Sequence, residues 1–133
     1  MPFVLDASAA LEAAFDDESG AVGARVMDRL AHDEAYVPPI WFGEVVHGIL
    51  QAVRRGRVPL DGAHRMLAGL ADCAISPVPD HAESRALLDA AHRTGLSAYD
   101  AAYLLLAVDT GLELATCDQR LRAAAEQAGV ACL

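Results

Sequence analysis

Residues 3–15 read FVLDASAALEAAF, and this stretch determines which class of fold we expect. Three apolar residues lead to Asp6, a pattern typical of a short buried strand that ends in a carboxylate. The segment ASAALEAAF that follows is rich in Ala and Leu, which favour a helix. A strand that leads directly into a helix indicates a protein of the α/β class.

The rest of the chain continues this alternation of short apolar runs and helical patterns. Strands are predicted at residues 34–38, 73–79, 113–116 and 130–133, helices at residues 20–31, 40–53, 60–71, 80–95, 96–107 and 118–129, and an acidic turn at residues 16–20. We therefore expect an α/β three-layer sandwich with a mainly parallel central sheet of about five strands. No linker or internal repeat divides the chain, so residues 1–133 are expected to form a single domain.

The composition excludes several classes of protein. With 54% hydrophobic residues, the chain of 133 residues has too many apolar side chains for a disordered protein. No apolar run reaches the ~18 residues needed to cross a bilayer, and the N-terminal FVLDASA lacks the basic region of a signal peptide. Cys73, Cys117 and Cys132 are odd in number and lack the spacing of a metal site. We therefore expect reduced thiols, a cytoplasmic location and no contact with a membrane.

The charge is acidic overall, with one dense basic cluster. A net charge of −9 argues against loose, non-specific binding to nucleic acid. Arg54, Arg55 and Arg57 form the basic cluster, within the sequence RRGR. One interpretation is a helix end that is stabilised by cations and stopped by Gly56. The other is a clamp for RNA phosphates, because Arg side chains match phosphate oxygens; both interpretations can hold together.

Four acidic residues occupy comparable positions in the predicted elements. Asp6 and Asp118 lie at the carboxyl ends of predicted strands, where helices begin. Glu44 and Asp100 lie in the first turns of predicted helices. In open α/β sheets, sites form outside the carboxyl ends of the strands. A common edge of the sheet is therefore expected to bring the four carboxylates together.

Each carboxylate also has a purely structural interpretation. Asp6 and Asp118 can be helix N-caps, and Ser97 with Asp100 fits a capping box at the start of LSAYDAAYLLLA. Glu44 can be a solvated helix residue. Taken together, the four carboxylates fit the structural interpretation less well. Asp6 and Asp118 follow apolar strands, and Asp100 lies near the start of a helix that is apolar almost all round. Capping does not require such burial.

Electrostatics limits what a cluster of four carboxylates can be. Two carboxylates ~5 Å apart repel by about 3 kcal/mol at an effective dielectric constant of ~20. Either some of the four stay protonated, or a divalent cation compensates the charge. Carboxylate oxygens without His or Cys ligands suit Mg²⁺ or Mn²⁺ better than Zn²⁺. Such ions activate water and stabilise a leaving phosphate-ester oxygen.

With these residues in place, the chain resembles the PIN domain family, and within it the VapC-type ribonuclease toxins of type II toxin–antitoxin systems. The resemblance covers nearly the whole chain. It is carried by VLDASA at residues 4–9, by Glu44 within PPIWFGEVVHGI, by GLSAYDAAYLLLA at residues 95–107, and by LATCDQRL at residues 114–121. The order and spacing of the four acids make the resemblance specific, whereas any one segment alone would be weak.

The resemblance implies a fold, an activity and partners. It implies an endoribonuclease that depends on Mg²⁺ or Mn²⁺, with Asp6, Glu44, Asp100 and Asp118 as metal-binding and catalytic residues. The hydroxyls of the residues at positions 8 and 116, Ser8 and Thr116, fall where the family often places hydroxyls near the metal. The resemblance also implies a homodimer and a cognate antitoxin whose C-terminal segment blocks the site.

Other chemistries fit the sequence less well. Glu44 and His47 have the spacing of a di-iron ligand pair, but such a site needs further inward-facing Glu residues in a helical bundle. A haloacid-dehalogenase-like phosphatase would have a second Asp at position 8, and a phospho-receiver would have a Lys, which this chain lacks. Trp41 and Phe42 are expected in the core or a dimer interface. The remaining alternative is a catalytically silent PIN-like module that acts through protein partners.

Overall fold

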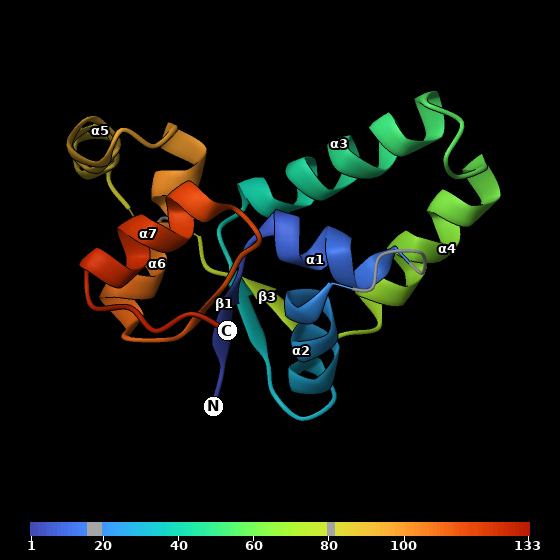
Figure 1. The fold of residues 1–133 in the computed structure, drawn as a ribbon, viewed down its shortest axis with the longest axis horizontal. Coiled ribbons are helices and arrows are strands. Elements are labelled where there is room, and N and C mark those ends of the chain that lie inside the picture. Colours follow the sequence, from blue (N-terminus) through green and yellow to red (C-terminus); the bar gives the residue numbers. More distant parts are fainter. Residues whose placement is uncertain (16–19, 80–81) are drawn as a thin grey trace.

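The computed structural model describes residues 1–15, 20–79 and 82–133. The strands are β1 (Phe3–Leu5), β2 (Ala35–Val37), β3 (Ile75–Pro77) and β4 (Leu114–Ala115). They form a parallel sheet in the order β3-β2-β1-β4, which Figure 1 shows at the centre of the molecule. Val4 pairs with Tyr36 on one side and with Leu114 on the other, so β1 is an inner strand.

The prediction of about five strands is wrong by one, because the described residues form a four-stranded sheet. Residues 130–133, predicted as a strand, form a single parallel bridge between Cys132 and Leu114. Two backbone hydrogen bonds flank this bridge, from Leu114 N–H to the Ala131 carbonyl and from Leu133 N–H to the Leu114 carbonyl. The segment follows a turn at Gly129, and its described pairing does not extend beyond this bridge.

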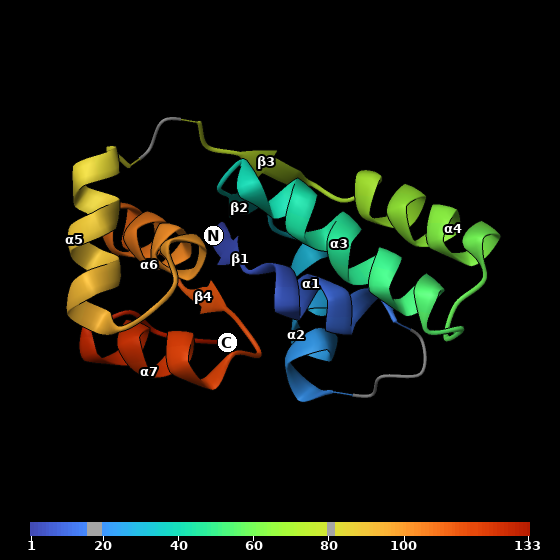
Figure 2. The same ribbon diagram turned by 90° about the horizontal axis from the view of Figure 1, so that it is seen from above.

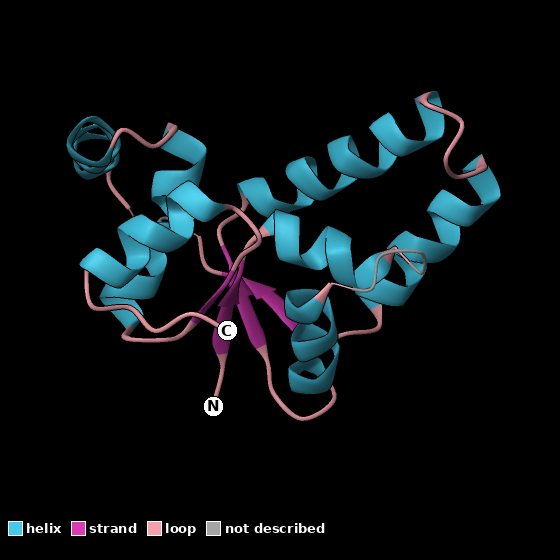
Figure 3. Cartoon of the chain, viewed as in Figure 1, coloured by secondary structure: helices cyan, strands magenta, loops and turns pink. Residues whose placement is uncertain are grey.

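Helices cover both faces of the sheet. Their bounds are α1 (Ala7–Ala14), α2 (Ala21–Leu30), α3 (Ile40–Arg54), α4 (Leu60–Ala71), α5 (Ser84–Thr94), α6 (Ala98–Thr110) and α7 (Gln119–Gln127). In Figures 1 and 3, α1–α4 lie on one side of the strands and α5–α7 on the other. Seen from above in Figure 2, α3 and α4 run side by side away from the sheet. The expected α/β three-layer arrangement is confirmed.

The start of α5 differs from its prediction. We expected a helix over residues 80–95 with an Asp start, but α5 begins at Ser84 with Glu83 at the N-cap. Asp80 lies outside the described residues, as do residues 16–19 of the predicted acidic turn. The predicted stop is confirmed, because Gly95 adopts a left-handed conformation with φ of 74° directly after the helix.

The core forms around β1 and the helix α6. Phe3, Val4 and Leu5 are fully buried, as are most of the inward-facing residues of α6, including Tyr103. Trp41 also belongs to the core, as expected, whereas its neighbour Phe42 is 46% exposed. No helix within the described ranges is long and apolar enough to cross a bilayer. Burial of β1 delivers the next residue, Asp6, to the edge of the sheet where several helices begin.

Candidate active site

The candidate site lies where the carboxyl ends of β1 and β4 meet the first turns of four helices. Figure 1 shows the beginnings of α1, α3, α6 and α7 gathered at this end of the sheet. Asp6 directly follows β1, and Asp118 precedes α7. Glu44 lies in the second turn of α3, and Asp100 in the first turn of α6. Each carboxylate therefore sits where the strand and helix pattern of the sequence placed it.

Asp6 is held by two hydroxyl groups. The Ser8 hydroxyl donates to Asp6 Oδ2 at 2.6 Å, and the Thr116 hydroxyl donates to the same oxygen at 2.7 Å. Asp6 is 4% exposed and Thr116 is fully buried. A buried carboxylate with good hydrogen bonds keeps a fixed orientation, so these hydroxyls position Asp6. Ser8 and Thr116, which the family resemblance singled out, thus both contact Asp6.

The same hydroxyls tie Asp6 to the loop that follows β4. The backbone N–H of Cys117 donates to Ser8 Oγ at 3.0 Å, and the backbone N–H of Asp118 donates to Thr116 Oγ1 at 3.0 Å. Each hydroxyl therefore accepts from the loop and donates to Asp6. This chain of hydrogen bonds fixes the position of Asp118 relative to Asp6, although 112 residues separate them in sequence.

Burial makes the charge of Asp6 costly. Desolvation raises the pKa of Asp6, and the hydrogen bonds from Ser8 and Thr116 oppose this shift because they favour the ionised form. The negative charge of Asp118 raises the pKa further. A nearby cation would lower it.

Glu44 is held by a residue that the sequence analysis did not identify. The phenol of the fully buried Tyr103, on α6, donates to Glu44 Oε1 at 2.7 Å. Burial, and then the hydrogen bond to Glu44, raise the pKa of Tyr103 far above its ordinary value, so the phenol remains a donor. Burial also raises the pKa of Glu44, and the charges of Asp6 and Asp100 add to the shift. Glu44 is therefore not the solvated helix residue of the structural interpretation.

Asp100 combines a capping position with an environment of like charges. Its backbone N–H donates to Ser97 Oγ at 3.1 Å, which confirms one half of the predicted capping box. Burial raises the pKa of Asp100, and the charges of Asp6 and Asp118 raise it further, while the hydrogen bond with Ser97 and then the charge of Arg120 oppose the shift. The capping bond uses the backbone N–H of Asp100, whereas the carboxylate interacts with the neighbouring acids as well as with Ser97.

Asp118 is a helix cap, as its structural interpretation predicts. Its Oδ1 accepts from the backbone N–H groups of Arg120 at 2.9 Å and Leu121 at 3.0 Å. Asp6, in contrast, occupies the N-cap position of α1 without a side-chain capping hydrogen bond. Capping therefore accounts for Asp118 in part and does not account for Asp6.

The four carboxylates interact through their charges, but their side chains do not form a closed cluster. The charge of Asp6 acts on Glu44 and Asp100, and that of Asp118 acts on Asp6 and Asp100. Within the described ranges, no three His, Cys, Asp or Glu side chains are arranged to hold a metal ion. The structure thus brings the quartet to one edge, and a shared cation would require its side chains to converge.

The donor atoms at this edge suit a hard divalent cation. They are carboxylate and hydroxyl oxygens from Asp6, Glu44, Asp100, Asp118 and Ser8. Oxygen ligands of this kind favour Mg²⁺ or Mn²⁺. Burial and neighbouring negative charges raise the pKa values of three of the carboxylates. A bound divalent cation would compensate this negative charge.

The basic cluster lies at the other end of α3. Arg54 is ten residues after Glu44 on this helix, a separation of about 15 Å along the helix axis. The guanidinium of Arg57 lies 4.0 Å from the centre of the Phe15 ring. Gly56 has φ of 73°, and the turn that contains it ends α3 as the structural interpretation of RRGR predicts. Arg54, Arg55 and Arg57 are therefore remote from the carboxylates.

Comparisons with known proteins agree with the fold. A model of the PIN domain family matches residues 3–127 of the chain. The solved structures include a similar chain, the "Crystal Structure of PAE2754 from Pyrobaculum aerophilum", with a TM-score of 0.77 and 23% sequence identity over 99% of this chain and 89% of that chain. At this identity the likeness shows a common fold. A comparison with curated proteins finds no match.

Proposed function

The chain belongs to the PIN domain family, and from this premise we propose that it is an endoribonuclease that uses Mg²⁺ or Mn²⁺ to hydrolyse RNA phosphodiester bonds. PIN domains are generally nucleases, which supports nuclease activity for this chain. The observation that supports metal-dependent hydrolysis of RNA is the buried carboxylate of Asp6, which two hydroxyls orient. Three further carboxylates interact with Asp6 or with one another.

The residues of the site would either bind the metal or position the residues that bind it. Asp6 and Asp100 would be the strongest metal ligands, and Glu44 and Asp118 would complete the cluster or orient the attacking water. When bound, a divalent cation supplies an activated water and stabilises the leaving oxygen. Ser8 and Thr116 hold Asp6 in place, and Tyr103 holds Glu44. Fixed orientation of this kind lowers the cost of assembling the reacting geometry.

We propose that Arg54, Arg55 and Arg57 contact phosphates only in a longer RNA. These side chains are exposed, and their guanidinium groups match phosphate oxygens. Because Arg54 follows Glu44 by about 15 Å along α3, we expect the cluster to contact nucleotides beyond those next to the scissile bond. A loss of affinity in Arg54→Gln for long RNA, but not for short RNA, is the expected result.

We also propose that the protein is the cytoplasmic toxin of a toxin–antitoxin pair, and that the C-terminal segment of a small antitoxin blocks the site. The net charge of −9 favours encounter with a basic segment, and an Arg or Lys of this segment would pair with one of the four carboxylates. Replacing this cation with Ala should weaken inhibition, and excess Mg²⁺ should compete with the segment. An antitoxin that inhibits equally well without a basic residue at the site would refute this mechanism and leave the nuclease proposal intact.

A homodimer is part of the same proposal. Phe42, Val46 and Leu50 are spaced by four residues on α3 and are 46%, 48% and 37% exposed. Residues with this spacing share one face of a helix. Adjoining apolar side chains on a surface are typical of an interface with another protein. They support self-association through α3.

Cleavage of an RNA panel tests the nuclease proposal. The wild-type protein should cleave RNA with Mg²⁺ or Mn²⁺ and stop when a chelator is added. Asp28→Asn is a matched control, because Asp28 is an exposed carboxylate on α2, outside the site. A protein that binds partners but cleaves no RNA at any metal concentration would instead be the catalytically silent module.

A further inference from the structure

A cavity beside the carboxylates is lined by positively charged side chains, which would attract RNA, whereas the catalytic carboxylates would repel it. It has a volume of about 490 Å³ and lies where the end of α5, the buried face of α6 and one side of α7 meet. Its polar lining includes Arg93, Thr94, Arg120 and Gln127. Among the described residues that line it, two carry guanidinium groups and none carries a carboxylate.

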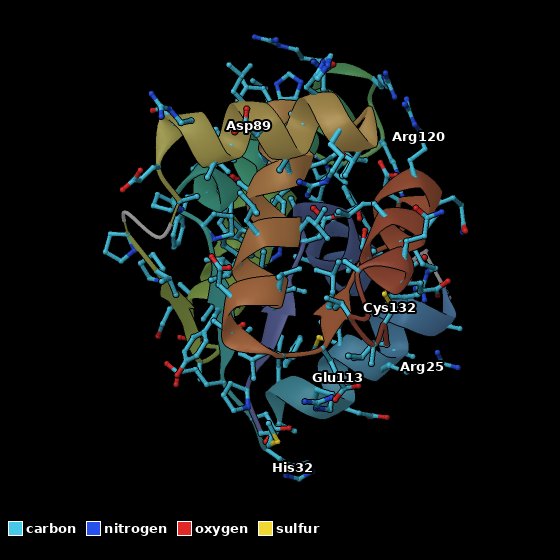
Figure 4. All side chains as sticks on the ribbon, turned by 90° about the vertical axis from the view of Figure 1, so that its left-hand side faces the viewer. Arg25, His32, Asp89, Glu113, Arg120 and Cys132 are labelled. Atoms are coloured by element: carbon cyan, nitrogen blue, oxygen red, sulfur yellow. The ribbon has the colours of Figure 1, made fainter. Side chains whose placement is uncertain are left out.

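Arg120 links this cavity to the candidate site. It lies in the first turn of α7, two residues after Asp118, and its backbone N–H donates to Asp118 Oδ1 at 2.9 Å. Its Nη2 donates to the Gly95 carbonyl at 2.9 Å, so the guanidinium lies over the turn between α5 and α6. A guanidinium has five N–H donors, and this bond uses one of them. Figure 4 labels Arg120 on the outer surface of α7, near the end of α5.

Arg93 provides the second cation. It lies in the last turn of α5 and is exposed. Neither Arg93 nor Arg120 forms an ion pair with a residue in the described part of the chain. In a protein with a net charge of −9, two such cations in one concave surface beside four acids provide a local attraction for an anionic chain.

The apolar part of the cavity suits a nucleoside. Leu96 and Leu104 form buried apolar lining, and Ala124 adds to it from α7. Gln127 lies seven residues after Arg120 on α7, so the cavity extends about 10 Å along this helix, away from the carboxylates. A small number of polar groups around an apolar floor is the usual composition of a ligand site.

From these observations we propose that this cavity binds the nucleotide next to the scissile phosphate of RNA, with Arg93 and Arg120 on its phosphates and the apolar lining against its ribose and base. The proposal rests on the proposed ribonuclease function. RNA would then run from the catalytic site into this cavity. Its nearest phosphate contacts would lie on α5 and α7, and not on the remote Arg54, Arg55 and Arg57.

A second cavity of the molecule does not adjoin the carboxylates. It has a volume of about 620 Å³ between α1, α2 and α4, and its lining includes Arg57 and Arg65. Its described lining includes no residue of α6 or α7, and its lining residues on α1 lie at the end of that helix away from Asp6. The cavity that adjoins the site is therefore the one lined by Arg93 and Arg120.

The salt dependence of RNA binding tests the proposal without requiring cleavage. A fluorescein-labelled single-stranded RNA is titrated with Asp6→Asn protein in Mg²⁺, because this variant is expected to bind RNA without cutting it. Each phosphate contact on a single strand contributes about 0.7 to the slope of log K against log salt, which is about fivefold in affinity at 0.1 M salt. Arg93→Gln and Arg120→Gln in this protein should each reduce the slope by about 0.7, and together by about 1.4.

Two further variants separate charge from folding and from non-specific attraction. Arg25→Gln removes an exposed cation from α2, which Figure 4 shows well apart from Arg120, and should leave the slope unchanged. Arg120→Lys keeps the charge but alters the bond to the Gly95 carbonyl, and should retain most of the slope. Arg93 makes no hydrogen bond that its replacement would break in the described structure, so Arg93→Gln is the cleaner variant.

Each outcome decides between the proposals. Slopes of Arg93→Gln and Arg120→Gln that equal the Arg25→Gln slope would overturn the cavity as an RNA subsite. If the wild-type protein still cleaves RNA in Mg²⁺, the ribonuclease proposal survives that result. A wild-type protein that neither cleaves nor binds RNA overturns both. A trimmed RNA that lacks the neighbouring nucleotide on one side, and no longer responds to Arg93→Gln, would identify the side of the scissile bond that the cavity holds.

Discussion

Replacing Tyr103 with Phe removes one hydroxyl from the site and leaves the buried ring in place. The lost interaction is a 2.7 Å hydrogen bond from a fully buried phenol to Glu44 Oε1. A hydrogen bond to a charged group contributes about 1.5–3 kcal/mol, which corresponds to roughly 10-fold to 150-fold in an equilibrium or rate constant. Loss of a group that orients a metal ligand typically costs about 10–100-fold in metal affinity or activity. The two ranges agree, so we expect Tyr103→Phe to lower activity at limiting Mg²⁺ by about one to two orders of magnitude.

The assay for this prediction measures RNA cleavage as a function of Mg²⁺ and, separately, Mn²⁺ binding by calorimetry. If Tyr103 positions Glu44, both titrations should shift to higher metal concentration. Tyr36→Phe is the matched control, because it removes a hydroxyl from a half-buried tyrosine on β2. Equal metal affinity and activity in Tyr103→Phe and wild type, with both variants folded, would refute the positioning role.

Three other predictions concern the remaining carboxylates and the α3 surface. Asp100→Asn should keep the cap, which uses the backbone N–H, and change the free energy of unfolding by at most about 1 kcal/mol, while activity falls by orders of magnitude; an active variant would make Asp100 only a cap. The pKa values of Asp6, Glu44 and Asp100 are raised above 3.8, 4.5 and 3.8, so the native state binds these protons more readily than the unfolded state. In chelator, the melting temperature should therefore rise as pH falls from neutral through the raised values towards about 4.5, and added Mg²⁺ should stabilise the protein at neutral pH; a melting curve unaffected by saturating metal would count against the site. Val46→Glu should convert a dimer to monomers in sedimentation experiments, and an unchanged mass would remove α3 from the interface.

Much of the fold was predictable because local patterns and tertiary packing agree. The apolar residues 3–5 and the helix that follows predicted the first β–α connection, and Gly95 predicted the end of α5. The short segment at residues 130–133 looked like a strand, but a strand requires a partner over several residues, and this one pairs only near Leu114. The start of α5 was placed too early because an acidic residue before a helical pattern fits a cap at more than one position.

The positions of the candidate site residues were predictable, but their interactions were not. Asp6 and Asp118 follow strands, and strand ends in a parallel sheet meet at one edge. Tyr103 was missed because its partner Glu44 is 59 residues away, and the local pattern marks it only as part of an apolar helix. Its spacing of three residues from Asp100 was the available signal, since residues three apart lie on one face of a helix.

Arg120 was missed for a different reason. Within DQRLRAAAEQAG it reads as an ordinary exposed residue of a helix, whereas the RRGR cluster has the higher local density of charge. Density along the chain does not show which cations the fold brings near the acids. That depends on the packing of α7 beside the turn between α5 and α6, which the hydrogen bond to Gly95 reports.

Single-turnover cleavage of RNA by wild type and Asp6→Asn, at equal Mg²⁺ concentrations, tests the central claim most directly. The Asn side-chain oxygen can still accept from Ser8 and Thr116, so the hydrogen bonds around position 6 should survive while the buried charge is lost. The account predicts that cleavage falls by orders of magnitude while the melting temperature in chelator is unchanged or higher. Cleavage by a folded Asp6→Asn protein at a rate near that of wild type would contradict it.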